Sequence, residues 1–417
     1  MKKLLFSVCI IFLFNLSVSA SINTTDMFKE DFKVTIEWLE QKPKSHAKDF
    51  FILQYLEQDD ISIEEAKIAY SMANESNTTV KKVYNKKFKT LPPEELKCYR
   101  ASIEQLKKED SKCIALGLSL IEATEISKND LNFFINKLDA YPTLKKDLQI
   151  IASDNPFYSL INSDIDRFFR LFFDLNKEYR SKFFNKSLNQ ELVDKIAKSK
   201  NFERFLRYVI YDTSLTNLQK SLLSIENNPE MTSENLFSLG INAVNNNNLN
   251  IALKFFNEAN KKSYLKTHKD KSLYWLYLLT QNQLYLEELA LSWDNNIYSL
   301  YAKELLNVEI DNIEFSIPLK NTKSSFNIYD PFEWMKVLDD TKKNFDEQKL
   351  QKYENLFSDE STLAHHAFIL ERFTKYKKQY FITPYRNIVK NYDVDKQVLI
   401  YSIARQESHF IPSSISF

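Results

Sequence analysis

The residues best suited to chemistry lie near the end of the chain, in the run Arg405-Gln406-Glu407-Ser408-His409. Leu399, Ile403 and Glu407 are spaced four apart, so they share one face of a helix that we expect Asp395 to cap. A carboxylate at the end of an apolar stripe is partly desolvated, and desolvation raises its pKa toward neutrality. A general acid for glycoside cleavage needs that property. From spacing alone, however, a helix-end glutamate that is solvated or paired with Arg405 is the better interpretation.

The histidines are weaker candidates. His365 and His366 are adjacent, so their side chains point to different faces of a helix and do not readily hold one metal ion. We therefore interpret them as surface or packing residues. His409 is close enough to Glu407 to tune its pKa, although a solvent-exposed ring is the simpler interpretation. The sequence predicts no metal site and no cofactor.

Composition indicates that helices position these residues. Apolar residues make up 44% of the 417-residue chain, enough for a sizeable core, and only 2 glycines occur, Gly117 and Gly240. Rossmann folds, P-loops and β-rich folds need glycines for positive-φ turns and close backbone approach. Helices joined by turns that carry Asn, Asp and Ser do not need them. The predicted fold class is therefore all-α.

Apolar residues recur every three or four positions from Asp26 to about Lys390, in short segments separated by polar or proline-bearing joints. This pattern predicts helical hairpins stacked in a superhelical solenoid. One pair matches the small and aromatic positions of a tetratricopeptide-type repeat, with Asn245 to Asn248 as its turn: Leu239-Gly240, Ala243, Ala252, Phe256 and Ala259. The small residues let the two helices approach, and Phe256 fills the gap between them. Solenoids mostly bind or scaffold, so the repeat itself carries no information about chemistry.

The first twenty residues are typical of an export signal. Lys2 and Lys3 give a positive start, Leu4 to Leu16 is apolar, and Val18-Ser19-Ala20 fits a cleavage site. The apolar stretch is shorter than the ~20 residues that cross a bilayer, and no other segment is apolar enough for a membrane. A retained anchor helix and a lipid on Cys9 are the less favoured alternatives.

Export would place the chain in an oxidising compartment, where an even number of cysteines favours a disulfide. The mature chain would have two, Cys98 and Cys113. They lie in helical segments at about 94–108 and 111–121, which could form a hairpin that brings them within bonding range. Two buried free thiols, which pack as small apolar residues, are an equally good interpretation.

The charge balance argues against nucleic acid as a partner. Basic and acidic residues each number 56, and loss of Lys2 and Lys3 with a signal leaves 54 basic residues. No basic surplus and no block of like charges marks a nucleic-acid surface or a charged tail. A neutral polymer or a partner of mixed charge fits this balance better.

Periodicity weakens from Ile310 to Tyr329, where Pro318 and several Ser and Asn residues predict a linker. We divide the chain into a signal at 1–20, a U-shaped helical superhelix at 21–310, a linker with connecting helices at 311–380, and a C-terminal segment at 381–417.

The C-terminal segment resembles the opening of the catalytic domain of soluble lytic transglycosylases, which are related in fold to goose-type lysozyme. The resemblance rests on the run Arg405-Gln406-Glu407-Ser408, on Phe410, Pro412 and Ser416, and on the lead-in from Tyr380-Phe381 to Pro384-Tyr385. Ser414 departs from the pattern, because the family usually carries alanine there. The helical repeats are similar to that family's superhelical ring, and the export signal agrees with a periplasmic murein enzyme.

The resemblance implies cleavage of the β-1,4 bond between N-acetylmuramic acid and N-acetylglucosamine in peptidoglycan, with a 1,6-anhydro product and no cofactor. Glu407 would act as acid and then as base, and Ser408 would bind the substrate. The family continues with a Gly-Ala-x-Gly-Leu-Met-Gln-like segment, whereas this sequence ends at Phe417. We therefore expect a truncated catalytic domain that is inactive or impaired.

The alternative is a non-catalytic periplasmic scaffold of helical repeats that binds glycan strands or cell-wall enzymes. In both cases we expect a monomer with no transmembrane segment. A third hypothesis is a helical-repeat protein of unrelated function, in which the Arg-Gln-Glu-Ser match is chance.

Overall fold

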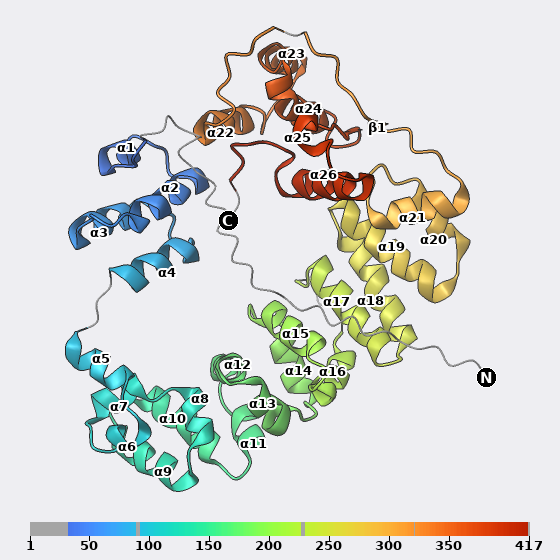
Figure 1. Ribbon diagram of the computed structural model, residues 1–417. Helices are drawn as coiled ribbons and strands as arrows, with labels where there is room; N and C mark the ends of the chain where they lie inside the picture. Colours follow the sequence, from blue (N-terminus) through green and yellow to red (C-terminus); the bar gives the residue numbers. More distant parts are fainter. Residues whose placement is uncertain (1–31, 89–91, 227–229, 321, 416–417) are drawn as a thin grey trace. The chain divides into compact units, whose positions relative to one another are not determined.

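The computed structural model describes residues 32–88, 92–226, 230–320 and 322–415 (Figure 1). These residues form 26 α-helices and one short pairing of two strands, so the predicted all-α class is confirmed. None of the helices in this described part is both long and apolar enough to span a membrane. The predicted signal at 1–20, with Cys9, and also Ser416 and Phe417, lie outside the described residues.

The chain divides into two compact units. The first contains the described residues of 1–89, 314–375 and 379–417, and the second contains those of 90–313 and 376–378. This division differs from the one drawn on the sequence, which kept 21–310 together and set 381–417 apart. The first helices share a unit with the last ones because Phe332 enters the same apolar cluster as Leu39 and Phe51. Its ring stacks on that of Phe51, with centroids 5.8 Å apart.

The helices of the first unit come from both ends of the chain. They are α1 (Ile36–Glu40), α2 (His46–Glu57), α3 (Ile63–Ser71), α4 (Thr78–Lys87), α22 (Pro331–Asp340), α23 (Glu347–Leu356), α24 (Leu363–Phe373), α25 (Arg386–Val389) and α26 (Val394–Ser408), with the 3-10 turn η4 (Glu360–Thr362). Thr35, Ser45 and Ser62 cap the first three by accepting backbone N–H bonds. Strand β1 (Ile313–Glu314) pairs with β2 (Gln379–Tyr380).

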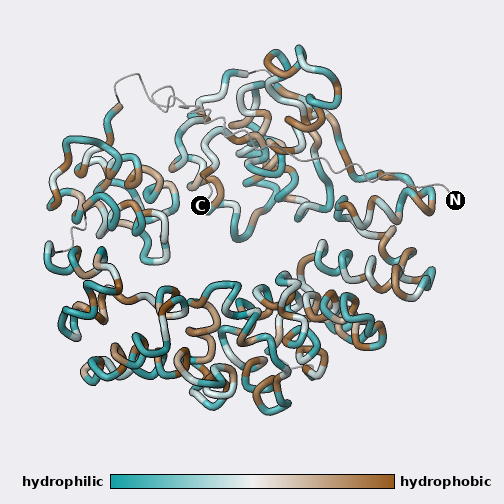
Figure 2. The backbone as a smooth tube through the Cα atoms, turned by 60° about the horizontal axis from the view of Figure 1, so that its bottom comes forward, coloured by the Kyte–Doolittle hydropathy of each residue, from teal (hydrophilic) through white to brown (hydrophobic). Residues whose placement is uncertain are grey.

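The helices of the second unit follow one another along the chain. They are α5 (Pro93–Tyr99), α6 (Ile103–Leu106), α7 (Ser111–Gly117), α8 (Leu120–Glu125), α9 (Lys128–Lys137), α10 (Pro142–Ala152), α11 (Pro156–Ile161), α12 (Ile165–Asp174), α13 (Lys177–Tyr179), the π-helix η2 (Arg180–Phe184), α14 (Gln190–Ala197), α15 (Phe202–Tyr211), α16 (Thr216–Ser221), the 3-10 turn η3 (Leu222–Ser224), α17 (Ser233–Asn245), α18 (Leu249–Lys262), α19 (Lys266–Thr280), α20 (Gln283–Ala290) and α21 (Ile297–Leu306). Pro93, Pro142 and Pro156 each open a helix, where the missing N–H is harmless. Figure 2 shows apolar and polar stretches alternating along these helices, as amphipathic packing requires.

Helices α17 and α18 form a hairpin at the position that the sequence match indicates. The turn between them includes Asn247 at a left-handed φ of 57°. A Cβ atom added at Gly240 would lie 2.5 Å from Cε1 of Phe256. The Phe256 ring is fully buried and stacks on Trp275, with centroids 5.6 Å apart, so it has little room to withdraw. The missing side chain at Gly240 therefore allows the close approach of the two helices.

A disulfide joins α5 and α7. Cys98 and Cys113 are bonded, with Cα atoms 5.1 Å apart, so the structure contains the bonded pair rather than two free thiols. The two helices also approach closely, because a Cβ atom at Gly117 would collide with the Cys98 carbonyl group. Both cysteines are buried in the apolar core of the second unit.

Gly240→Ala should lower the free energy of unfolding of the second unit by about 1–3 kcal/mol, because overpacking against Phe256 exceeds the gain in helix propensity. The loss should be smaller in a Phe256→Leu background, where the shorter side chain leaves room for the new methyl group. Urea unfolding of the four proteins measures both effects. An equal loss in both backgrounds would show that Phe256 is not the obstacle.

Removing the disulfide should also destabilise the second unit. The cysteines are 15 positions apart in sequence, and closing a loop of that length stabilises a fold by about 3 kcal/mol. Cys98→Ala combined with Cys113→Ala, or reduction of the wild type, should lower the unfolding free energy by roughly that amount. The double variant serves as the control, since its stability should not respond to reductant. Identical unfolding curves for oxidised and reduced wild type would contradict a stabilising bond.

Candidate functional site

The run that carries Glu407 forms the last turn of α26 and the tight turn after it. Asp393 caps the helix by accepting the Lys396 N–H at 2.9 Å, so the predicted cap, Asp395, lies within the first turn instead. At the other end, His409 and Phe410 adopt left-handed φ values of 49° and 64°. Their N–H groups bond back to carbonyl groups of the last helical turn, which ends the helix without a glycine.

A buried carboxylate on α24 contacts this last turn. Glu371 is 1% exposed, and its Oε1 accepts hydrogen bonds from Arg405 Nη2 at 2.6 Å and from the Tyr380 N–H at 2.7 Å. Its Oε2 lies 3.4 Å from His409 Nδ1. Arg405 also donates through Nη1 to the Tyr380 carbonyl at 2.8 Å, and its guanidinium lies over the Phe381 ring at 4.4 Å. We call Glu371, Arg405, Tyr380 and His409 the Glu371 clasp.

The clasp keeps Glu371 charged. Burial alone would raise the pKa of Glu371, but the hydrogen bonds from His409 and Tyr380 and the Arg405 charge outweigh it, and the pKa lies below its ordinary value. Sequence reasoning missed this residue. The available signal was that Glu371 is the one acidic residue of α24, directly after an apolar stretch.

Glu407 points away from the clasp. An α-helix has about 3.6 residues per turn, so a side chain two positions from Arg405 lies nearly on the opposite side. Glu407 is exposed, and no described residue hydrogen-bonds to its carboxylate. Leu399 and Ile403, the predicted apolar stripe, are 58% and 54% exposed. The described part of the first unit packs no element over this stripe, so Glu407 is solvated in this structure.

The other residues of the predicted site lie around the end of α26. Ser408 is half-buried, and its Oγ donates to the Ala404 carbonyl at 3.3 Å, so the hydroxyl is directed at the backbone. The lead-in segment reaches the same place, since the Tyr385 hydroxyl donates to the Phe410 carbonyl at 3.4 Å. The structure thus brings together the two segments on which the family resemblance rests.

His365 and His366 are both buried in the first unit, as packing residues. The His365 ring lies among those of Phe326, Trp334 and Phe357, with centroids 5.0–5.4 Å away. Neither of its ring nitrogens has a hydrogen-bond partner among the described residues. Burial lowers the pKa of each histidine to about 4. The described residues contain no group of three or more His, Cys, Asp and Glu side chains arranged to hold a metal ion.

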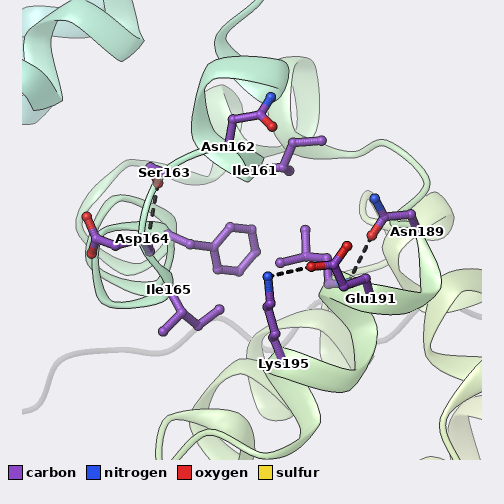
Figure 3. A pocket seen from close by; sticks show the side chains of 10 residues that line it. Ile161, Asn162, Ser163, Asp164, Ile165, Asn189, Glu191 and Lys195 are labelled. Atoms are coloured by element: carbon purple, nitrogen blue, oxygen red, sulfur yellow. Dashed lines mark hydrogen bonds and ion pairs between the residues drawn. The ribbon is translucent and has the colours of Figure 1, made fainter.

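A pocket of about 410 Å³ lies in the second unit, between the α11–α12 turn and the start of α14 (Figure 3). Apolar side chains, including Phe168, combine there with polar ones: Asn162, Ser163, Asp164, Asn189, Glu191 and Lys195. Asp164 and Asn189 cap α12 and α14, so their oxygens already accept backbone N–H bonds. Glu191 and Lys195 pair at 2.7 Å. The lining thus suits binding of a polar, neutral ligand better than acid–base chemistry.

No protein-family model matches the chain, and no curated protein matches it.

The buried histidines should make the first unit lose stability in acid. A histidine in the unfolded chain titrates near ~6.5, whereas His365 in the folded unit titrates near 4. The stabilising effect of the neutral ring is therefore complete above about pH 6.5 and is lost as the pH falls toward 4. At about 1.4 kcal/mol for each pH unit, the loss for His365 is on the order of 3 kcal/mol.

His365→Phe should remove this part of the pH dependence, because a phenylalanine fills the aromatic site without titrating. The free energy of urea unfolding, measured from pH 7 to pH 4.5 in both proteins, gives the comparison. The same slope with and without His365 would exclude the residue as a source of acid sensitivity.

Proposed function

We propose that this protein is a soluble lytic transglycosylase of peptidoglycan, with Glu407 as its acid–base residue. The observation that carries the proposal is the placement of Glu407 in the run Arg405-Gln406-Glu407-Ser408. The carboxylate is exposed on the last turn of α26, whose opposite side is held by the Glu371 clasp. A side chain that is accessible while its backbone is fixed suits a group that must meet a bound glycan.

In the proposed reaction, Glu407 first donates its proton to the oxygen between N-acetylmuramic acid and N-acetylglucosamine, and the bond from that oxygen to C1 breaks. The muramyl C6 hydroxyl then attacks C1, and the ionised Glu407 takes the hydroxyl proton. The product is a 1,6-anhydro sugar, and Glu407 returns to its starting state. This exchange of roles by one carboxyl group follows the logic of retaining glycosidases.

The remaining residues support the site in simpler ways. The N-acetyl group of the substrate can stabilise the positive charge at C1, so no second carboxylate is needed. Ser408 would bind this acetamido group once its hydroxyl turns from the Ala404 carbonyl, to which it now donates. A general acid must stay protonated, which requires that water be excluded from its carboxyl group, whereas Glu407 is exposed to solvent. We therefore expect activity to depend on a cover over the face of Leu399, Ile403 and Glu407.

The second unit has a binding role in this proposal. We propose that its helical hairpins form a solenoid, because α17 packs on α18, α18 on α19 and α20 on α21 in succession. The polar pocket in this unit would contact the glycan strand. The Cys98–Cys113 disulfide supports a periplasmic location, since disulfides persist in oxidising compartments.

A non-catalytic scaffold for glycan strands or cell-wall enzymes is the second candidate. The exposure of Glu407 favours this candidate, because an exposed carboxylate lacks the desolvation that a general acid needs. The two functions differ in their dependence on Glu407, since a scaffold would bind peptidoglycan equally well without that carboxylate.

Glu407→Gln should abolish release of 1,6-anhydro muropeptides from purified sacculi, measured by mass spectrometry. We compare the chain itself, where we expect at most trace release because Glu407 is exposed, with a chimera in which a transglycosylase catalytic domain follows α26 and covers Glu407. In the chimera the loss should be at least ~10²-fold, as expected when a general acid is removed.

Gln406→Ala is the matched control, because this neighbouring side chain is exposed and should leave release nearly unchanged. Release that survives Glu407→Gln would refute the assignment of the acid. A chimera that binds sacculi and releases no anhydro product would favour the scaffold.

A further inference from the structure

The rotation of α26 about its axis is not determined by buried apolar residues. The helix has 15 residues, and none of them is buried. Packing of a buried face is the usual source of a helix's orientation. Phe410 and Ile411, which follow the helix, enter the apolar core of this unit as buried residues, whereas Tyr401 and Ala404 of the helix pack against that core only partly buried. The polar contacts of the last turn must therefore contribute to fixing the direction in which that turn faces.

Those contacts converge on one carboxylate. Arg405 lies two positions before Glu407 and His409 two positions after it, and both face Glu371. Arg405 makes a second contact, with the Tyr380 carbonyl, so its guanidinium binds two groups outside α26. A guanidinium bound in two directions restricts rotation more than a single hydrogen bond does.

We infer that Glu371 is a positioning residue for Glu407. Its carboxylate contacts Arg405 and His409, which lie two positions before and two positions after Glu407. The last turn therefore cannot rotate without breaking the charge-assisted hydrogen bond between Arg405 and the buried Glu371. The direction of the Glu407 side chain follows from that of the turn. The inference rests on the proposed function in one respect, since it takes Glu407 as the group that meets substrate. The restraint of the turn by Glu371 does not depend on the proposed function.

The same geometry explains the backbone after the helix. His409 and Phe410 both adopt left-handed φ values, which residues other than glycine seldom do. This turn directs the His409 ring toward Glu371, with Nδ1 3.4 Å from Oε2, and places Phe410 in the core. Loss of the carboxylate would remove the acceptor toward which the His409 ring is directed.

Hydrogen exchange in the full chain tests the restraint without reference to catalysis. In Glu371→Ala, the backbone amides of 404–411 should exchange at least ~10-fold faster, because the turn opens locally. Glu371→Gln should give a smaller increase, since its amide oxygen can still accept a bond from Arg405 or Tyr380. The amides of α23 should be unchanged, which separates local opening from unfolding of the unit. Glu347→Gln, an exposed acid of α23, is the matched control and should leave all rates unchanged.

Kinetics of the catalytic chimera test the positioning. Glu371→Gln should lower kcat about 10-fold with KM unchanged, because binding is retained while Glu407 is misdirected. Adding Arg405→Lys should lower kcat little further, since both changes break the same contact.

The outcomes separate the two claims. Unchanged exchange of 404–411 in both Glu371 variants overturns the inference, whatever the activity. Faster exchange with unchanged kcat also overturns it, because Glu371 would then stabilise the turn without directing Glu407. A wild-type chimera without activity defeats the proposed function, and the exchange rates then still decide whether Glu371 restrains the turn.

Discussion

Both units depend on buried carboxylates that receive hydrogen bonds from more than one segment of the chain. Among the described residues, four acids are at most 3% exposed: Asp49, Asp147, Asp270 and Glu371. A charge removed from water is tolerated only when donors replace the water. Asp49 of α2 accepts from the backbone and side chain of Asn74, beyond α3, and Asp147 of α10 accepts from two arginines of α12. Each acid thus sets the distance between the elements that supply its donors.

Helix ends are the second constraint, and here they are satisfied almost without glycine. The turns that need a left-handed residue use asparagine, as at Asn247 and Asn307, or other side chains. Both glycines have negative φ and lie in helices, at points where a Cβ atom would meet a neighbouring helix. Glycine is therefore rare because residues with side chains form the left-handed turns, and the two glycines lie only where helices pack closely.

Local features of this fold could be predicted from the sequence, and long-range pairings could not. The all-α class followed from composition, and the Asn245 to Asn248 turn followed from the spacing around it. Periodicity located the stripe of Leu399 and Ile403, but it does not say whether an element covers that stripe. Glu371 and Arg405 are 34 positions apart, and no local pattern indicates their pairing. The carboxylate that contacts the last turn of α26 was missed for this reason.

The left-handed turn and the buried charge together determine the register of α26, meaning its position along its own axis. A shift by one helical turn would put Tyr401 or His409 in the place of Arg405 beside Glu371. A buried carboxylate that loses its cation costs about 3–5 kcal/mol, which is a large fraction of the roughly 5–15 kcal/mol that stabilises a typical domain. Apolar packing alone selects only weakly among such shifts, since Tyr401 and Ala404 are the residues of the helix that pack against the core and both are only partly buried. The carboxylate of Glu371, together with the turn that places Phe410 in the core, therefore gives α26 one alignment.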